Sequence, residues 1–332
     1  MTQATLDIVG IGNAIVDVIA QSDDAFLASH ALSKGSMQLV DAETAELLYS
    51  EMGPGLEVSG GSAANTLAGM AALGMKCGFI GQVCDDQLGS VFAHDIRALG
   101  IRYTTPAIND GVPTARCLIL VTPDAQRTMN TFLGASQFLP ASALDPDLIA
   151  SARMLYLEGY LWDPEEPRKA MRSAIDMARK AGREVAFTLS DNFCIARHRE
   201  DFQALIDNGE IDVLFANEGE IKSLNQIDNF EKAVAATADK VRTLVVTRSE
   251  KGAIAIQNGV RHEVAAVPVS QVIDTTGAGD LFAAGFLTGY LSGRPVSDSL
   301  AMGAAAAAEI ISHYGARPEA DLKALMAENL GG

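Results

Sequence analysis

The chain has 332 residues, of which 48% are hydrophobic and 20% charged, so it can bury a large core as one big α/β domain or two smaller ones. Its formal net charge of −17 argues against nucleic acid and anionic membrane surfaces as partners, because both are bound by basic patches. Any phosphate ligand must therefore be held by local devices such as helix N-termini, a few lysine or arginine side chains, and a divalent metal.

Near the start of the chain, the apolar run Leu6–Ile11 is closed by a glycine and predicts a buried strand whose far end opens onto a site. Asn13 and Asp17 follow this strand. The β-branched segment 15–19 and the segment 36–40 are too short to build a core of their own. We expect them to pair with each other as strands of a small accessory sheet.

A glycine-rich helix start is predicted at the next stretch, Gly60-Gly61-Ser62-Ala63-Ala64-Asn65-Thr66. We expect this helix to end at Gly74. The alternative is a plain loop in which Ser59 or Ser62 is the N-cap. A strand over 76–83 and a helix over 86–99 follow.

Residues 114–134 change the pattern, because two strand-like runs, 115–121 and 127–133, flank a Thr-Pro-Asp-Ala turn and predict a β-hairpin. We assign this hairpin to the same accessory sheet. Strands and helices then alternate, which predicts a mostly parallel sheet covered by helices on both faces, with sites at the carboxyl ends of the strands. The predicted strands are 154–157, 184–189, 213–216, 243–247, 253–257 and 263–267, the last two as a hairpin, and the predicted helices are 165–181, 199–206 and 230–238.

The stretch Asp274-Thr275-Thr276-Gly277-Ala278-Gly279-Asp280 is followed at once by the apolar run Leu281–Leu291, so a glycine-rich turn enters a helix. The unpaired N–H groups and the dipole of a helix start can hold an anion, and Gly277 and Gly279 let the backbone approach it closely. Asp280 adds a carboxylate beside the same N–H groups. An acid next to an anion hole indicates phosphoryl transfer, although an acid in a first turn can also be only a partner of the helix dipole.

The chain contains no G-x-x-x-x-G-K-[ST] phosphate loop, no H-E-x-x-H and no G-x-S-x-G, which excludes several familiar enzyme classes. Its four cysteines lack C-x-x-C and metal-ligand spacing and are expected to be buried, reduced thiols. No signal peptide and no apolar run of membrane-spanning length is visible, so we expect a cytoplasmic protein. The two glycine-rich helix starts fit one loop for an uncharged polar substrate and one for the transferring phosphate.

Taken together, these motifs resemble those of the ribokinase-like (PfkB) carbohydrate kinases, most closely the adenosine kinase branch. The stretches that carry the resemblance, in the family's order, are Gly10–Asp17, Gly60–Asn65, Asn217–Glu220, Val246–Gly252 and Asp274–Asp280. The resemblance implies an α/β ribokinase-like fold, in which a mostly parallel central sheet is flanked by helices on both faces. It also implies one kinase domain over residues 1–332, with a small β-sheet lid built from segments within 13–60 and 103–135.

By the same resemblance, Asp280 is the catalytic base, which takes a proton from the substrate hydroxyl as that hydroxyl attacks the γ-phosphorus of ATP. The N–H groups of Gly277, Ala278, Gly279 and Asp280 form the anion hole for the transferring phosphoryl group, and the two glycines also contact ATP. The physical chemistry agrees, because phosphoryl transfer needs alignment and charge stabilisation more than covalent chemistry.

The resemblance also implies where the substrate binds. Asp17, Asn65 and the backbone at Gly60 and Gly61 hold the sugar hydroxyls, with Asn13 nearby. Carboxylate and amide groups suit vicinal diols because together they accept and donate hydrogen bonds.

On the nucleotide side, Asn217 and Glu220 match the family's N-x-x-E element, which organises Mg²⁺ through water, whereas the alternative for this pair is a solvated helix start. Thr247 and Gly252 match the loop on the adenine and phosphate side of ATP, in which Ser249 replaces a frequent glycine.

Asp274 and Thr276 fall where some relatives bind a monovalent cation, so K⁺ is a candidate cofactor. An N-cap role for Thr276 is the alternative.

The lysine that sugar kinases of the ribokinase type often carry in the Gly-Gly-Lys-Gly-x-Asn loop is replaced here by Ser62, which favours the nucleoside branch. A purine base needs apolar and aromatic walls, for which Tyr160, Trp162 and Phe132 are candidates, although core or lid packing also explains aromatic residues at these positions. We therefore expect an ATP-dependent kinase of a primary ribosyl hydroxyl. Adenosine to AMP, a purine salvage reaction, is the first choice.

The alternatives are a simple sugar kinase of the ribose, fructose or 2-keto-3-deoxy-sugar type, and a catalytically silent nucleoside- or sugar-binding regulator on the same fold. Asp280 argues against the regulator, since a pure binder needs no acid beside an anion hole. The expected partners are Mg²⁺ with ATP and a small-molecule acceptor, with no nucleic acid and no membrane. The chain is expected to be a monomer or a homodimer through the lid.

Overall fold

A computed structural model of the chain describes residues 4–109, 111–124 and 126–330. Its larger sheet carries most of the core. In spatial order, the strands of this sheet are β14 (Val260–Val264), β13 (Ala253–Gln257), β12 (Thr243–Thr247), β11 (Val213–Asn217), β10 (Glu184–Thr188), β9 (Ala152–Glu158), β1 (Leu6–Ile11), β5 (Cys77–Ile80) and β6 (Arg102–Tyr103). All pairs from β12 to β6 are parallel, and β13 and β14 extend the sheet as an antiparallel hairpin.

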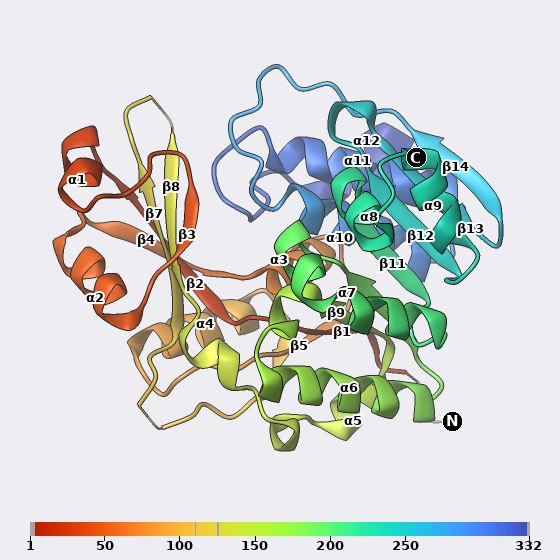
Figure 1. Ribbon diagram of the computed structural model, residues 1–332, viewed down its shortest axis with the longest axis horizontal. Helices are drawn as coiled ribbons and strands as arrows, with labels where there is room; N and C mark the ends of the chain where they lie inside the picture. Colours follow the sequence, from red (N-terminus) through yellow and green to blue (C-terminus); the bar gives the residue numbers. More distant parts are fainter. Residues whose placement is uncertain (1–3, 110, 125, 331–332) are drawn as a thin grey trace.

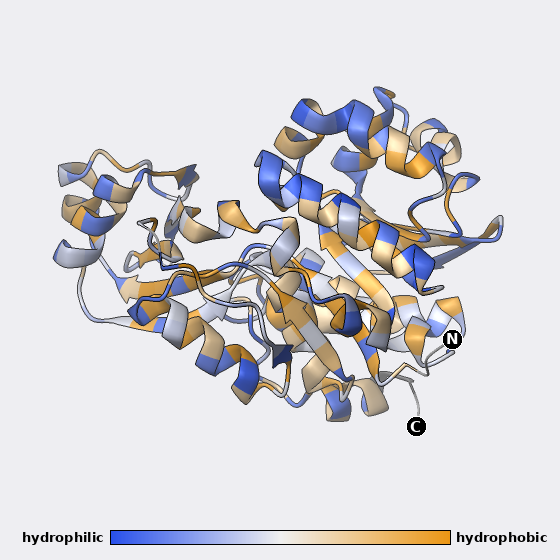
Figure 2. Ribbon diagram, turned by 90° about the horizontal axis from the view of Figure 1, so that it is seen from below, coloured by the Kyte–Doolittle hydropathy of each residue, from blue (hydrophilic) through white to orange (hydrophobic). Residues whose placement is uncertain are grey.

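Helices cover both faces of this sheet, as the alternation of strands and helices predicts. Along β1, Ile8 packs with one group of helices, whereas Val9 packs with the other, and both side chains are fully buried. The first group includes α3 (Ser62–Ala72), α4 (Gln87–Ala98), α10 (Ala278–Leu291), α11 (Val296–Ile310) and α12 (Leu322–Leu330). The second includes α5 (Pro146–Ser151), α6 (Glu165–Lys180), α7 (Asn192–Asp207), α8 (Glu218–Asn225) and α9 (Phe230–Ala238). Figure 2 shows the hydrophobic strands enclosed by helices of mixed hydropathy. The predicted fold class is confirmed.

A smaller sheet projects from one side of this body, together with α1 (Asp24–Ser29) and α2 (Ala42–Glu51), at the left of Figure 1. In spatial order, its strands are β3 (Met37–Leu39), β8 (Arg127–Phe132), β7 (Ala115–Val121), β2 (Ile15–Gln21) and β4 (Gly55–Gly60). Strands β7 and β8 form the predicted antiparallel hairpin.

The predicted pairing of segment 36–40 with segment 15–19 is wrong. Strand β3 pairs with β8, while β2 pairs with β7 and β4. The hairpin therefore separates the two segments. Short strands of similar composition carry little information about their partners, because pairing depends on contacts that are distant in sequence.

Three elements differ from their predicted bounds by three residues or more. Strand β5 stops at Ile80, short of the predicted residue 83. Helix α7 begins at Asn192, because the Asp191 side chain caps it by accepting a hydrogen bond from the Cys194 N–H at 2.6 Å. Non-helical φ and ψ at His198 kink this helix, so the predicted helix 199–206 corresponds to the part after the kink. Strand β14 covers Val260–Val264 instead of 263–267. The two-residue turn Asn258-Gly259, with φ of 50° and 78°, starts the second strand of this hairpin at once.

Of the cysteines, Cys77, Cys117 and Cys194 are buried thiols. Within the described part of the chain, no helix is both long and apolar enough to cross a membrane.

Helices α10 and α11 pack so closely that glycine is required at their contact. A β-carbon added to Gly285 would lie 2.4 Å from the backbone oxygen of Met302 and 2.8 Å from the backbone nitrogen of Gly303. Because backbone atoms cannot move aside as a flexible side chain can, this contact fixes how α10 lies against the body.

We expect Gly285→Ala to lower the free energy of unfolding by about 1–3 kcal/mol, because the added methyl group forces the two helices apart. Urea unfolding measures this loss. Gly53→Ala is the matched control, since its β-carbon would lie 3.8 Å from the backbone oxygen of Gln21, the nearest heavy atom apart from its neighbours in the chain. Equal stability of the two variants would contradict the proposed tight contact.

Candidate active site

A cavity of about 490 Å³ lies where the small sheet faces the starts of α3 and α10 and the carboxyl ends of β10, β11 and β12. The predicted site residues that line it are Asp17, Gly61, Asn65, Asn217, Glu220, Thr247, Gly277, Ala278, Gly279 and Asp280. Asn13, Gly60, Gly252 and Asp274 are not among its lining residues. The fold thus brings together residues from both halves of the chain.

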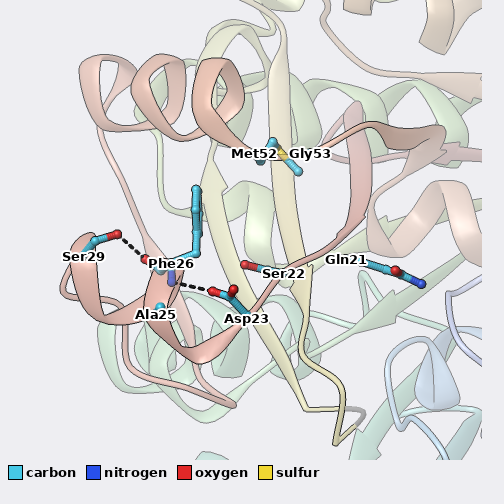
Figure 3. A pocket seen from close by; sticks show the side chains of 8 residues that line it. All are labelled: Gln21, Ser22, Asp23, Ala25, Phe26, Ser29, Met52 and Gly53. Carbon is cyan, nitrogen blue, oxygen red and sulfur yellow. Dashed lines mark hydrogen bonds between the residues drawn. The ribbon is translucent and has the colours of Figure 1, made fainter.

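A larger, shallow hollow of about 620 Å³ lies beside α1 at the outer part of the small sheet (Figure 3). None of the predicted site residues lines it. Asp23 accepts a hydrogen bond from the Phe26 N–H at 2.8 Å, and the Ser29 hydroxyl donates to the Phe26 oxygen at 2.8 Å. These polar groups form hydrogen bonds within α1 and its N-cap. The 490 Å³ cavity, which most of the predicted site residues line, is therefore the candidate active site.

The carboxylate of Asp280 joins the two glycine-rich helix starts. It lies in the first turn of α10 and accepts hydrogen bonds from the Ser62 hydroxyl at 2.6 Å and the Asn65 side-chain amide at 3.1 Å, both from α3. Burial raises the pKa of Asp280 above its usual range, and these two hydrogen bonds partly offset the rise. A buried carboxylate with a raised pKa is a suitable proton acceptor.

The turn before α10 presents backbone N–H groups to the same cavity. Gly277 is the N-cap, with a φ of 78° that favours glycine, so the alternative in which Thr276 caps this helix is wrong. The Ala278 N–H already donates to the Thr275 oxygen at 3.2 Å. The first-turn N–H groups of Gly279 and Asp280 cannot bond within the helix and are available to an anion.

Two glycines shape the opposite wall around Asp17 on β2. A β-carbon on Gly60 would lie 2.5 Å from an Asp17 carboxylate oxygen, and one on Gly61, whose φ is 99°, would lie 2.1 Å from the Asn13 oxygen. Gly60 therefore leaves room for the carboxylate, while Gly61 itself lines the cavity as the N-cap of α3. Burial raises the pKa of Asp17 to about 6, although two nearby arginines lower it.

Glu158, which the sequence analysis did not single out, lies behind this wall at the end of β9. It is fully buried and accepts hydrogen bonds from the N–H and side-chain amide of Asn13, both at 2.8 Å, and from the Ala63 N–H at 2.7 Å. Asn13 therefore positions the wall behind the cavity. Burial raises the pKa of Glu158 to about 7, against the effect of these hydrogen bonds. Its place at the carboxyl end of a predicted strand was the available signal.

Arg317, also missed, lies in the segment between α11 and α12. It donates hydrogen bonds to the Ala64 oxygen at 3.0 Å and to the oxygen and hydroxyl of Ser59 at 2.5 and 2.8 Å. Its positive charge lowers the pKa values of Asp17 and Asp280. No local pattern in the sequence points to this role, because all of these partners are distant along the chain.

Asn217 and Glu220 form a capping box at the start of α8. The Asn217 oxygen accepts from the Glu220 N–H at 2.8 Å, and the Glu220 carboxylate accepts from the Asn217 N–H and side-chain amide at 2.9 and 2.6 Å. Burial raises the pKa of Glu220 to about 7. No group of three or more His, Cys, Asp or Glu residues could hold a metal ion anywhere in the described ranges.

Thr247, at the end of β12, lines the cavity, whereas Gly252 supports the loop that follows. A β-carbon on Gly252, whose φ is 82°, would lie 2.0 Å from the Val264 oxygen. Ser249 has a φ of 50°, which lies in the left-handed region that glycine adopts most easily.

The three aromatic residues predicted as candidates to stack on a purine base lie in different environments. Trp162 is fully buried, donates to Asp201 at 2.9 Å and packs on Phe187, so it belongs to the core. Phe132 is also buried and does not line the cavity, whereas Tyr160 does. The small sheet adds an apolar wall that the sequence analysis missed, made of Ile15, Met37, Cys117, Ile119 and Met129.

Comparison with known proteins places these features in context. A model of the pfkB family of carbohydrate kinases matches residues 49–322. The 5-dehydro-2-deoxygluconokinase of Geobacillus kaustophilus (strain HTA426) is 30% identical over 266 residues, which cover 77% of this chain and 79% of that protein.

Two solved structures are similar over almost their whole length. A probable sugar kinase protein from Rhizobium etli CFN 42 is 45% identical, with a TM-score of 0.90 and 99% of each chain covered. Adenosine kinase from Sinorhizobium meliloti is 46% identical, with a TM-score of 0.89, covering 98% of this chain and 99% of that one.

We expect Glu158→Gln to flatten the dependence of stability on pH. The pKa of Glu158 rises from 4.5 to about 7 in the folded state, so its contribution is fully present below about pH 4.5 and is lost as the pH rises through about 7. Urea unfolding at several pH values measures the slope. The exposed Glu166→Gln is the control and should keep the slope of the unsubstituted protein, while parallel curves for all three proteins would contradict the assignment.

Proposed function

Because the chain belongs to the pfkB family of carbohydrate kinases, we propose that it transfers the γ-phosphoryl group of ATP to the primary hydroxyl of a ribosyl substrate, with adenosine as the acceptor. The family and the named kinases similar to the chain establish a phosphotransferase that acts on a hydroxyl, which removes the catalytically silent regulator from consideration.

The observation that carries this choice is the mixed lining of the cavity. Asp17 on β2 and Asn65 on α3 suit the ribose hydroxyls. The apolar side chains of Ile15, Ile119 and Met129 lie on the same face of the small sheet as Asp17 and also line the cavity. A purine base gains from an apolar wall, whereas a free sugar presents hydroxyl groups on most sides and loses their hydration there.

In the proposed mechanism, Asp280 accepts the proton of the attacking hydroxyl while Ser62 and Asn65 hold its carboxylate in place. The free N–H groups of the α10 first turn stabilise the charge that develops on the transferring phosphoryl group. A general base contributes typically about 10² to 10⁴ in rate. The small sheet, as a lid, would exclude water that could otherwise accept the phosphate.

Mg²⁺ travels with ATP in reactions of this kind, where it neutralises charge on the phosphate oxygens. The carboxylate of Glu220, which lines the cavity, fits an indirect role, because each of its oxygens already accepts one hydrogen bond from Asn217 and keeps capacity for one more. Glu220 would thus orient water molecules of the metal ion.

A simple sugar kinase is the second candidate. The 30% identity to 5-dehydro-2-deoxygluconokinase favours it, as does the 45% identity to the probable sugar kinase protein from Rhizobium etli CFN 42. Against it stands Ser62, which replaces the lysine frequent in sugar kinases and is engaged by Asp280.

An ATP transfer assay across adenosine, other nucleosides, ribose, fructose and 5-dehydro-2-deoxygluconate tests the acceptor. We expect adenosine to be preferred, and Met129→Ala to raise its KM about tenfold, corresponding to about 1.4 kcal/mol of lost apolar contact. Leu39→Ala, an exposed residue of the same sheet outside the cavity, is the control. A sugar that outperforms every nucleoside would overturn the adenosine assignment.

We expect Asp280→Asn to lower kcat by about 10² to 10⁴, because the amide keeps the shape of the side chain but cannot accept the proton. Adenosine binding, measured by calorimetry, should change little. Asp298→Asn is the matched control, since Asp298 is also an acid in a first helical turn but lies in α11. Near-normal turnover of the Asp280 variant would rule out this base.

A further inference from the structure

A buried ion pair lies behind the turn that precedes α10. The side chain of Asp274, in that turn, pairs with the Arg127 guanidinium at the start of β8. The two residues are only 9% and 8% exposed. A buried carboxylate requires a compensating positive charge, so the identity of its counter-ion matters for how the turn is held.

The carboxylate of Asp274 has no oxygen left for another cation. One oxygen accepts from the Thr276 N–H at 3.0 Å and the Thr276 hydroxyl at 2.8 Å, and the other accepts from the Gly315 N–H at 3.2 Å and from Arg127. Two carboxylate oxygens offer about four acceptor positions, so these four donors use all of them.

Arg127 is itself held in place. Its Nη1 also donates to the Thr276 hydroxyl oxygen at 3.1 Å, and its guanidinium lies 5.4 Å from the centre of the Tyr314 ring. The residue therefore contacts the turn, the segment after α11 and its own strand. These contacts do not fit a monovalent cation bound at Asp274 and Thr276, which is what the sequence resemblance implies.

We propose that Arg127 is a positioning residue that serves as the built-in counter-ion of Asp274, so that this kinase works without a monovalent cation. The guanidinium supplies the single positive charge that a K⁺ ion would otherwise supply, and it does so from the small sheet. The anion-hole turn is thereby tied to the sheet that carries the apolar wall. This inference rests on the proposed role of the turn at Gly277–Asp280 in holding the transferring phosphoryl group.

The first test uses the unsubstituted protein without substrate. Thermal unfolding is compared in KCl and in tetramethylammonium chloride at equal ionic strength, because a cation that binds only the folded state raises Tm. We expect equal Tm values in the two salts. A rise that is specific to K⁺ and saturates would overturn the proposal, and this measurement is independent of which acceptor the enzyme uses.

The second test follows ADP formation in the same two salts, with whichever acceptor supports turnover. We expect equal rates for the unsubstituted enzyme. Arg127→Gln should lower kcat by up to about 10²-fold, as expected when a catalytic turn is misplaced, and its residual rate or its Tm should become sensitive to K⁺. Arg127→Lys, which keeps the charge, should retain more activity than Arg127→Gln.

Arg116→Gln is the matched control, because Arg116 is also buried in the small sheet but pairs with Glu46 at 2.7 Å, away from the cavity. It should leave both kcat and the response to K⁺ unchanged. If the Gln variant of Arg127 does not fold, the comparison of salts on the unsubstituted protein still decides. Strong activation of that protein by K⁺ contradicts the proposal even where the kinase assignment holds.

Discussion

The two hydrogen bonds that Asp280 receives from Ser62 and Asn65 are the interaction on which the site depends. They require the starts of α3 and α10 to lie side by side. A β-carbon on Gly69 of α3 would lie 2.8 Å from the Ala284 side chain of α10, so glycine allows this close approach. The helix contact therefore sets the distance between the loop at Gly60–Gly61 and the turn at Gly277–Asp280, and the orientation of Asp280, the proposed base, follows from it.

The second constraint is electrostatic. Asp17, Glu158, Glu220 and Asp280 all lie at or behind the cavity wall, and burial raises the pKa of each. Such a cluster repels a triphosphate unless positive charge offsets it. The positive charge of Arg317 lowers the pKa of Asp17 and of Asp280. The metal ion that accompanies ATP would supply the remaining positive charge. A protein with a net charge of −17 thus depends on local positive charge at this site.

The elements and site residues that could be predicted from the sequence are those specified by residues close together in the chain. The stretch 274–280 combines glycine spacing with an apolar run, so both its turn and its helix follow from neighbouring residues. Glu158 and Arg317 were missed because their partners, such as Asn13 and Ser59, are distant in the chain and meet them only through the order of the strands. The pairing of β3 failed for the same reason, since a three-residue strand does not encode its neighbour.

The proposed phosphate side of the cavity is formed by backbone groups, whereas the proposed acceptor side is formed by side chains. This difference explains why the type of reaction is easier to infer than the substrate. The proposed phosphate side is built from backbone N–H groups at Gly279 and Asp280, which depend on helix geometry and little on side-chain identity. The proposed acceptor side is built from side chains such as Ile119 and Met129, where one substitution changes what fits. Arg127 lies two residues before Met129 on β8 and pairs with Asp274 in the turn before α10, so this one strand connects the two proposed sides.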